Sequence, residues 1–182
     1  MRVSGGRDEP LTLAFEAHEV GLLRQLVDET RMLLEKEIPR EDPVIARLFP
    51  EASDDADEAR AYEDMVGREL RKEKLRALSE VEQSLPEDGA GEVTITGDLA
   101  SAWLAWMNDV RLAVGTRLGV TEESMAAEVD PESPDGPAFS VLHWLGWIQE
   151  SIIERVPPQP GDDGEAEEEA GEAEGKGEEE TQ

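Results

Sequence analysis

The sequence predicts a mainly α fold of the α+β class: a compact bundle of about four to five helices with a small sheet of two to three strands. Apolar residues recur at steps of three and four along several long segments, which is the period of a helix face. Short alternating runs occur within residues 2–15 and 92–96, as in half-buried strands. The length of 182 residues suits one ordinary domain.

The chain divides into a single helical domain, residues 1–157, and an acidic Glu/Gly/Ala tail, residues 158–182. The tail holds 11 acidic residues and one lysine, and it has no aromatic residue. Such a segment cannot bury enough apolar surface to offset the entropy of ordering, so we predict that it is disordered. The first 157 residues still carry 34 acidic against 16 basic side chains, so the predicted domain is acidic in its own right.

The N-terminal region predicts a hairpin and then a helix. Turn residues at 4–7 lie between two short extended runs, and Leu11, Leu13 and Phe15 alternate with smaller residues. A broad apolar stripe then predicts a helix over residues 16–37, which a proline ends.

The middle of the chain predicts two further helices and a strand. A short helical turn opens at Asp42-Pro43, and a long helical pattern runs over residues 54–85 with a break near Gly67. Residues 92–96 (E-V-T-I-T) alternate like a strand. Because isolated strands are unstable in water, we expect this strand to pair with the N-terminal hairpin.

The C-terminal half predicts a central helix from Asp98, a short helix over 121–129 and a last helix over 137–156. Gly119 stands where a left-handed residue is expected after the central helix. The central helix carries Trp103 and Trp106, and the last helix carries Trp144 and Trp147 at the same spacing. The simplest expectation is that the two helices meet through these indoles, although one of the last two is a candidate for a groove or a homodimer interface.

A compact polar group interrupts the apolar central helix: Asn108, Asp109, Arg111 and Arg117. Asp109 and Arg111 are two residues apart and do not face each other on one helix, so each needs a partner on another segment. Gln149 is a candidate partner. The group is interpreted either as a structural polar network or as part of a partner-binding surface, and both alternatives stay open.

Five cations form the strongest basic cluster, in the run R-E-L-R-K-E-K-L-R: Arg68, Arg71, Lys72, Lys74 and Arg76. One interpretation is a patch for DNA phosphate or an acidic partner. The interpretation we favour is a solvated helix face laced with glutamates at i, i+3 and i, i+4. A net charge of -28 works against DNA binding, so any DNA contact is expected to be weak.

Patterns typical of catalysis are missing, and we do not expect an enzyme. The chain has no cysteine, and its two histidines, His18 and His143, fall on different predicted elements. No nucleophile motif or phosphate-binding glycine loop is present. We expect no metal and no cofactor. The longest apolar runs are far shorter than a membrane span, and no secretory signal is recognised, so a cytoplasmic location is expected.

Three motifs resemble a family of actinobacterial proteins, the AosR-like oxidative stress transcriptional regulators, formerly described as a domain of unknown function. The motifs are D-P-V-I-A-R-L-F-P-E-A (residues 42–52), A-W-L-A-W-M-N-D-V-R-L-A-V-G-T-R-L-G (102–119) and W-L-G-W-I-Q-E (144–150). The resemblance spans about residues 15–156 and leaves out the acidic tail.

The resemblance implies a cytoplasmic regulator that acts through protein contacts with a sigma factor or RNA polymerase. The alternative is an adaptor or scaffold connected with Clp-type proteolysis, which is suggested by gene neighbourhood in the family. Family members are linked to redox sensing through cysteines, whereas this chain has none. Its methionines beyond Met1 are expected to be buried.

Overall fold

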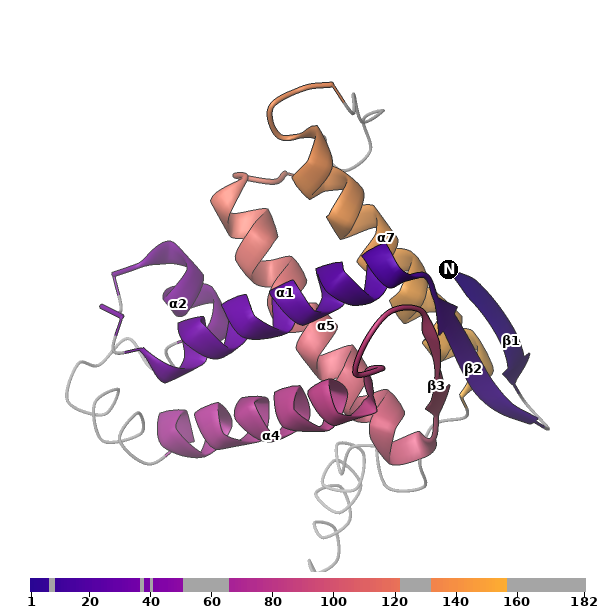
Figure 1. Ribbon diagram of the computed structural model, residues 1–182. Helices are drawn as coiled ribbons and strands as arrows, with labels where there is room; N and C mark the ends of the chain where they lie inside the picture. Colours follow the sequence, from indigo (N-terminus) through magenta and orange to yellow (C-terminus); the bar gives the residue numbers. More distant parts are fainter. Residues whose placement is uncertain (7–8, 37, 40, 51–65, 122–131, 157–182) are drawn as a thin grey trace, which may run out of the picture.

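The computed structural model describes residues 1–6, 9–36, 38–39, 41–50, 66–121 and 132–156. The predicted helix start at residue 54, the short helix predicted over 121–129 (apart from its first residue) and the acidic tail lie outside these residues. The described elements, in chain order (Figure 1), are β1 (Arg2–Gly6), β2 (Glu9–Phe15), α1 (Ala17–Glu35), α2 (Pro43–Leu48), α4 (Arg68–Ser84), β3 (Gly91–Ile95), α5 (Gly97–Arg117) and α7 (Gly136–Arg155).

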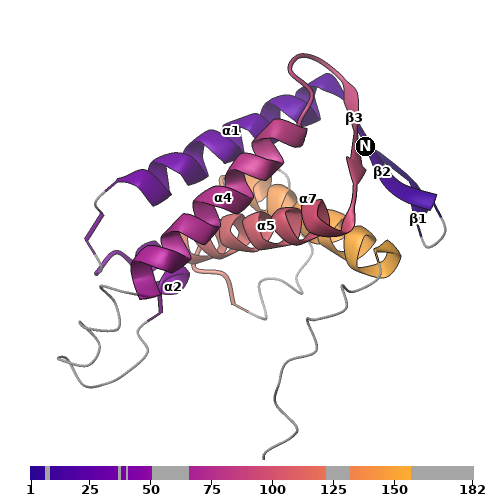
Figure 2. The same ribbon diagram turned by 90° about the horizontal axis from the view of Figure 1, so that it is seen from below.

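The three strands form one antiparallel sheet in the order β1-β2-β3, which confirms the pairing expected between the hairpin and the later strand. Leu11 lies opposite Ile95 and Leu13 opposite Val93, so alternate residues of both strands enter the core together. The sheet lies at one end of the helical layers, beside the start of α1 (Figure 2).

Residues 4–6 differ from the prediction, because the chain continues as strand through Gly6 where a turn was expected. The register with β2 shifts between Ser4 and Gly6, and Gly5 has a φ of 76°. A Cβ atom there would lie 2.1 Å from the carbonyl oxygen of Pro10, so only glycine fits. The glycine pair therefore makes a β-bulge inside the hairpin.

The helix ends follow from local chemistry. Glu16 and Glu19 form a reciprocal capping box at the start of α1. Asp42 accepts hydrogen bonds from the backbone N–H groups of Val44 (2.9 Å) and Ile45 (3.3 Å), which opens α2 as predicted. Gly119 has a φ of 60°, which confirms the predicted left-handed residue after α5.

Helix α5 is the centre of the bundle (Figure 1) and packs on α4, α2 and α7. Helix α1 packs mainly on α4 and has little contact with α5. The core between these helices and the sheet contains buried side chains from β2, α1, α2, α4, β3, α5 and α7. Among the described helices, none is long and apolar enough to cross a membrane.

Candidate functional site

The four polar residues of α5 do not form one network, since they point to different parts of the molecule. Asp109 is buried, Arg111 is half-buried, and Asn108 and Arg117 are exposed. Each buried or half-buried charge has its own partner on another helix, as the sequence required. Three separate places result: a seam against α4, a contact with α7 and a groove beside α1.

The seam between α4 and α5 holds a buried ion pair. The Nζ atom of Lys74 lies 2.5 Å from Oδ1 of Asp109, and the two side chains are 15% and 4% exposed. Burial raises the pKa of the Asp109 carboxyl above its ordinary value, although the hydrogen bond and charge of Lys74 act in the opposite direction. Desolvation is therefore the larger effect, and the carboxylate depends on Lys74 for its compensation.

Arg71 extends this seam toward the neighbouring helices. Its guanidinium lies 4.8 Å from the ring centroid of Phe49, at the end of α2, and it donates a hydrogen bond to the carbonyl oxygen of Leu34 near the end of α1. Lys74 lies 5.9 Å from the same ring. Arg71 and Lys74 therefore join α1, α2, α4 and α5, and neither is a free surface cation.

The rest of the basic cluster lies on the exposed side of α4. Lys72 pairs with Glu69 at 2.6 Å, and Arg76 pairs with Glu80 at 3.0 Å. Arg68 is also exposed. The favoured interpretation, a solvated helix face with cations paired to glutamates, therefore holds for Lys72 and Arg76. It does not hold for Arg71 and Lys74, which point inward, and the sequence analysis did not distinguish these two from the others.

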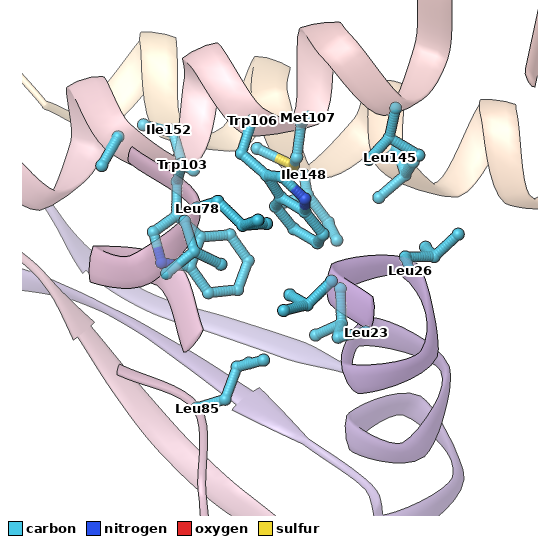
Figure 3. Close-up of a cluster of buried hydrophobic side chains, with 14 of the residues drawn as sticks. Leu23, Leu26, Leu78, Leu85, Trp103, Trp106, Met107, Leu145, Ile148 and Ile152 are labelled. Atoms are coloured by element: carbon cyan, nitrogen blue, oxygen red, sulfur yellow. The ribbon is translucent and has the colours of Figure 1, made fainter. Parts of the chain in front are cut away.

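The four tryptophans differ in role. Trp103 and Trp106 are buried against one another, with ring centroids 5.9 Å apart (Figure 3). Phe15 of β2 stacks on Trp103 at 5.9 Å and meets Trp144 edge-on at 6.3 Å. The prediction that the indoles of α5 and α7 contact each other directly is therefore wrong. Phe15 of the sheet lies between Trp103 of α5 and Trp144 of α7 and contacts both rings.

The two buried indole N–H groups also differ. Trp103 donates to the hydroxyl of Ser84 at 3.1 Å, so its polar atom is satisfied at the end of α4. The indole nitrogen of Trp106 is buried and has no hydrogen-bond partner among the described residues. Trp103 is therefore both a packing and a hydrogen-bonding anchor, and Trp106 is an apolar one.

Helix α7 has a polar contact with α5 on its inner side and exposes two large apolar side chains at separate places on its surface. Arg111 donates to Oε1 of Gln149 at 2.5 Å, which is the partner that the sequence suggested. The amide of Gln149 also donates to the carbonyl oxygen of Leu104 at 3.4 Å. Trp147 is 46% exposed on the outer face of α7; Ile153, six residues further on and 66% exposed, lies on a different side of the helix.

A groove runs between the C-terminal halves of α1 and α5, and sequence reasoning missed it. Its outer part has a volume of about 350 Å³ and adjoins a smaller inner hollow. We call the two together the α1–α5 groove; the residues that line it are Leu26, Glu29, Thr30, Met32, Leu33, Lys36, Ile38, Val110, Ala113, Val114 and Arg117.

Met32 is the unexpected member of this groove, since it is 49% exposed where a buried methionine was expected. Met107 of α5, by contrast, is fully buried. The one local signal was that Met32 stands outside the main apolar stripe of α1, four residues before Lys36. The depth of the groove depends on how far α5 lies from α1, which the sequence of either helix does not contain.

Among the described residues, no group of three or more histidine, aspartate or glutamate side chains could hold a metal ion. The arrangement offers buried polar contacts that set the packing of helices, and two exposed features that could bind a partner. These features are the outer face of α7 and the α1–α5 groove.

The chain belongs to the family described as domain of unknown function DUF2017, whose model matches residues 1–156. Together with relatives that carry the AosR name, this match confirms the AosR-like resemblance predicted from the three motifs. It also covers the two exposed features and excludes the acidic tail.

Three curated relatives are mycobacterial proteins that carry the AosR name. The one from Mycobacterium leprae is 29% identical over 127 residues, which cover 62% of this chain and 58% of the relative. The oxidative stress regulators AosR of Mycobacterium tuberculosis H37Rv and Mycobacterium bovis are each 29% identical over 135 residues, covering 62% of this chain and 57% of theirs. The chain thus spans somewhat less than two thirds of their length. No solved structure gives a significant match.

Proposed function

We propose that this protein is a cytoplasmic regulator of the oxidative stress response that acts through protein–protein contacts with a sigma factor or RNA polymerase. The relatives named as oxidative stress regulators support the regulatory class. The observation that carries the mode of action is the outer face of α7, where a large indole is exposed on an otherwise charge-rich protein.

The exposed face of α7 has the chemistry of a protein-binding surface. Trp147, Glu150 and Glu154 stand at i, i+3 and i+7, so they share one side of the helix, and all three are exposed. An exposed tryptophan is a frequent anchor of interfaces, and flanking carboxylates favour a basic partner. The excess of acidic residues across the whole chain also favours a basic partner.

DNA contact is secondary in this proposal. Two of the five cations in the basic cluster, Arg71 and Lys74, are occupied by contacts inside the bundle, and Lys72 and Arg76 each face a glutamate. Affinity for phosphate depends on cations that are free to neutralise it. A specific DNA complex would therefore depend on a partner protein.

The test is affinity capture of purified sigma factor and RNA polymerase by the full chain, after nuclease treatment and at low and moderate salt. Trp147→Ala should lower recovery about tenfold or more, as expected for an interface anchor. The matched control is Lys72→Ala/Arg76→Ala, which changes two exposed cations on α4 and should leave recovery unchanged.

Two results would contradict the proposal. If the α4 variant loses binding and the Trp147 variant keeps it, the exposed cations of α4 make the contact and the outer face of α7 does not. If Clp protease components are retained in a lysate version of the same experiment, and transcription proteins are not, the adaptor or scaffold alternative replaces the regulator.

A further inference from the structure

The α1–α5 groove is lined by an exposed methionine side chain and two cations. Met32 is 49% exposed on α1, and Lys36 follows it by four residues, on the same side of the helix. Arg117 reaches the groove from the end of α5. Oxidation of a thioether depends on access to its side chain, and about half of Met32 is exposed.

The two cations are available for chemistry in the groove. In the part of the chain that the structure describes, neither Lys36 nor Arg117 forms an ion pair. The remaining charged residue of the groove, Glu29, is on the same side of α1, and its carboxylate accepts a hydrogen bond from Gln25 at 2.9 Å. The groove therefore combines a thioether with free positive charge.

Met107 provides an internal contrast, since its side chain is fully buried in the core (Figure 3). The chain has no cysteine, so oxidation by thiol chemistry is excluded within it. Among the described methionines, Met1 is half-buried and Met32 alone is strongly exposed.

We propose that Met32 is a site of oxidation to the sulfoxide by peroxides, assisted by the neighbouring cations. A lone pair of the Met32 sulfur attacks one oxygen of the peroxide, the S–O bond forms and the O–O bond breaks. Sulfur loses two electrons, and the proton carried by the attacked oxygen passes, directly or through water, to the leaving oxygen, so the products are the sulfoxide and water or an alcohol. Lys36 and Arg117 stabilise the negative charge that develops on that oxygen.

Oxidation changes the surface chemistry of the groove. Methionine sulfoxide is polar and accepts hydrogen bonds. Oxidation therefore replaces the apolar thioether of Met32 with an oxygen to which Lys36 and Arg117 can donate hydrogen bonds. The link between this change and a stress response rests on the proposed function. The oxidation site itself does not depend on it, because it is measured without any partner.

The experiment exposes the folded full chain to hydrogen peroxide and follows each methionine by peptide mass spectrometry over time. Met32 should be oxidised at least tenfold faster than Met107. In urea, where both side chains are accessible, the two rates should converge. Equal rates in the folded protein, or oxidation that spares Met32, would overturn the assignment.

The role of the cations is tested by the variant Lys36→Ala/Arg117→Ala, with Lys72→Ala/Arg76→Ala as the control of equal charge. The groove variant should slow Met32 oxidation about threefold, which is the size expected for exposed charge interactions. An unchanged rate would remove the cations from the proposal.

Partner capture then separates this inference from the proposed function. Peroxide treatment should alter recovery of the transcription proteins from the wild type, and Met32→Leu should remove that response. If the untreated protein captures no partner, the proposed function fails while the oxidation site stands. If capture occurs and Met32→Leu responds to peroxide like the wild type, the regulatory role of Met32 fails.

Discussion

Helix α5 has a buried charge on one flank and an exposed charge on the other. Against α4 it buries Asp109 in an ion pair with Lys74, and the two helices pack closely. Against α1 it has little contact, and Arg117 lies at the edge of an open groove without an ion pair among the described residues. The same helix thus contributes a closed seam on one side and an accessible surface on the other.

This difference between the two flanks separates charges that stabilise the fold from charges that are available for binding. A buried pair has lost its water, so each partner depends on the other, and removal of one leaves an uncompensated charge. An exposed charge keeps its water and contributes little to stability. We therefore expect substitutions in the seam to change folding, and substitutions in the groove to change chemistry and binding.

The largest effect should come from Lys74→Met, which leaves Asp109 buried without its partner. We expect a loss of about 3–5 kcal/mol in the free energy of unfolding at pH 7, measured by urea denaturation with tryptophan fluorescence. The control Lys72→Met breaks an exposed pair and should cost no more than about 1 kcal/mol. The double variant Lys74→Met/Asp109→Leu should recover most of the lost stability. If Lys74→Met and Lys72→Met cost similar amounts, the contrast between the buried seam and the exposed surface is wrong.

The second prediction separates the two buried tryptophans. Trp103→Phe removes the hydrogen bond to Ser84, whereas Trp106→Phe removes a buried N–H without a described partner. The lost volume is the same in both, so Trp103→Phe should be less stable than Trp106→Phe by about 1 kcal/mol. Equal midpoints in urea would mean that the Ser84 contact contributes nothing.

The third prediction concerns pH and the seam. Burial raises the pKa of Asp109 above its ordinary value of 3.8, so between the two values the folded protein binds more protons than the unfolded chain. The stability that comes from this group is complete below pH 3.8 and falls as pH rises through the folded pKa. The unfolding free energy of the wild type relative to Asp109→Asn should therefore decrease with rising pH. An increase would show that Lys74 dominates.

The smallest effect on stability is expected in the groove. Arg117→Ala and Met32→Leu change exposed side chains, so each should shift the free energy of unfolding by no more than about 0.5 kcal/mol. Thermal melts of both variants beside the wild type provide the measurement. A loss of several kcal/mol would mean that the groove is part of the core, and the contrast between the two flanks would disappear.

Much of the local structure could be predicted because it depends on neighbouring residues. The periodicity of apolar residues gave the helices and strands that lie among the described residues, and turn chemistry gave the cap at Asp42 and the left-handed Gly119. The bulge at Gly5 was mistaken for a turn, since glycine pairs suit both and the strand pairing decides between them.

The candidate site could be predicted only where one partner implied the other. A charged Arg111 on an apolar helix needs an acceptor, and Gln149 on the next long helix was a natural choice. The Lys74–Asp109 pair and the Arg71–Leu34 contact join residues 35 and 37 positions apart, inside a cluster of similar cations. Sequence spacing along α4 does not say which of those cations face inward.

The sequence by itself determined the class of fold, the acidic character of the chain, the absence of thiol chemistry and the family. These properties depend on composition and on patterns within single elements. Only the tertiary structure decided which charges are buried, that Phe15 lies between Trp103 and Trp144, and that Met32 is exposed beside two cations. The physical reason is that burial depends on how closely helices approach one another, and that distance is set by side chains far apart in the chain.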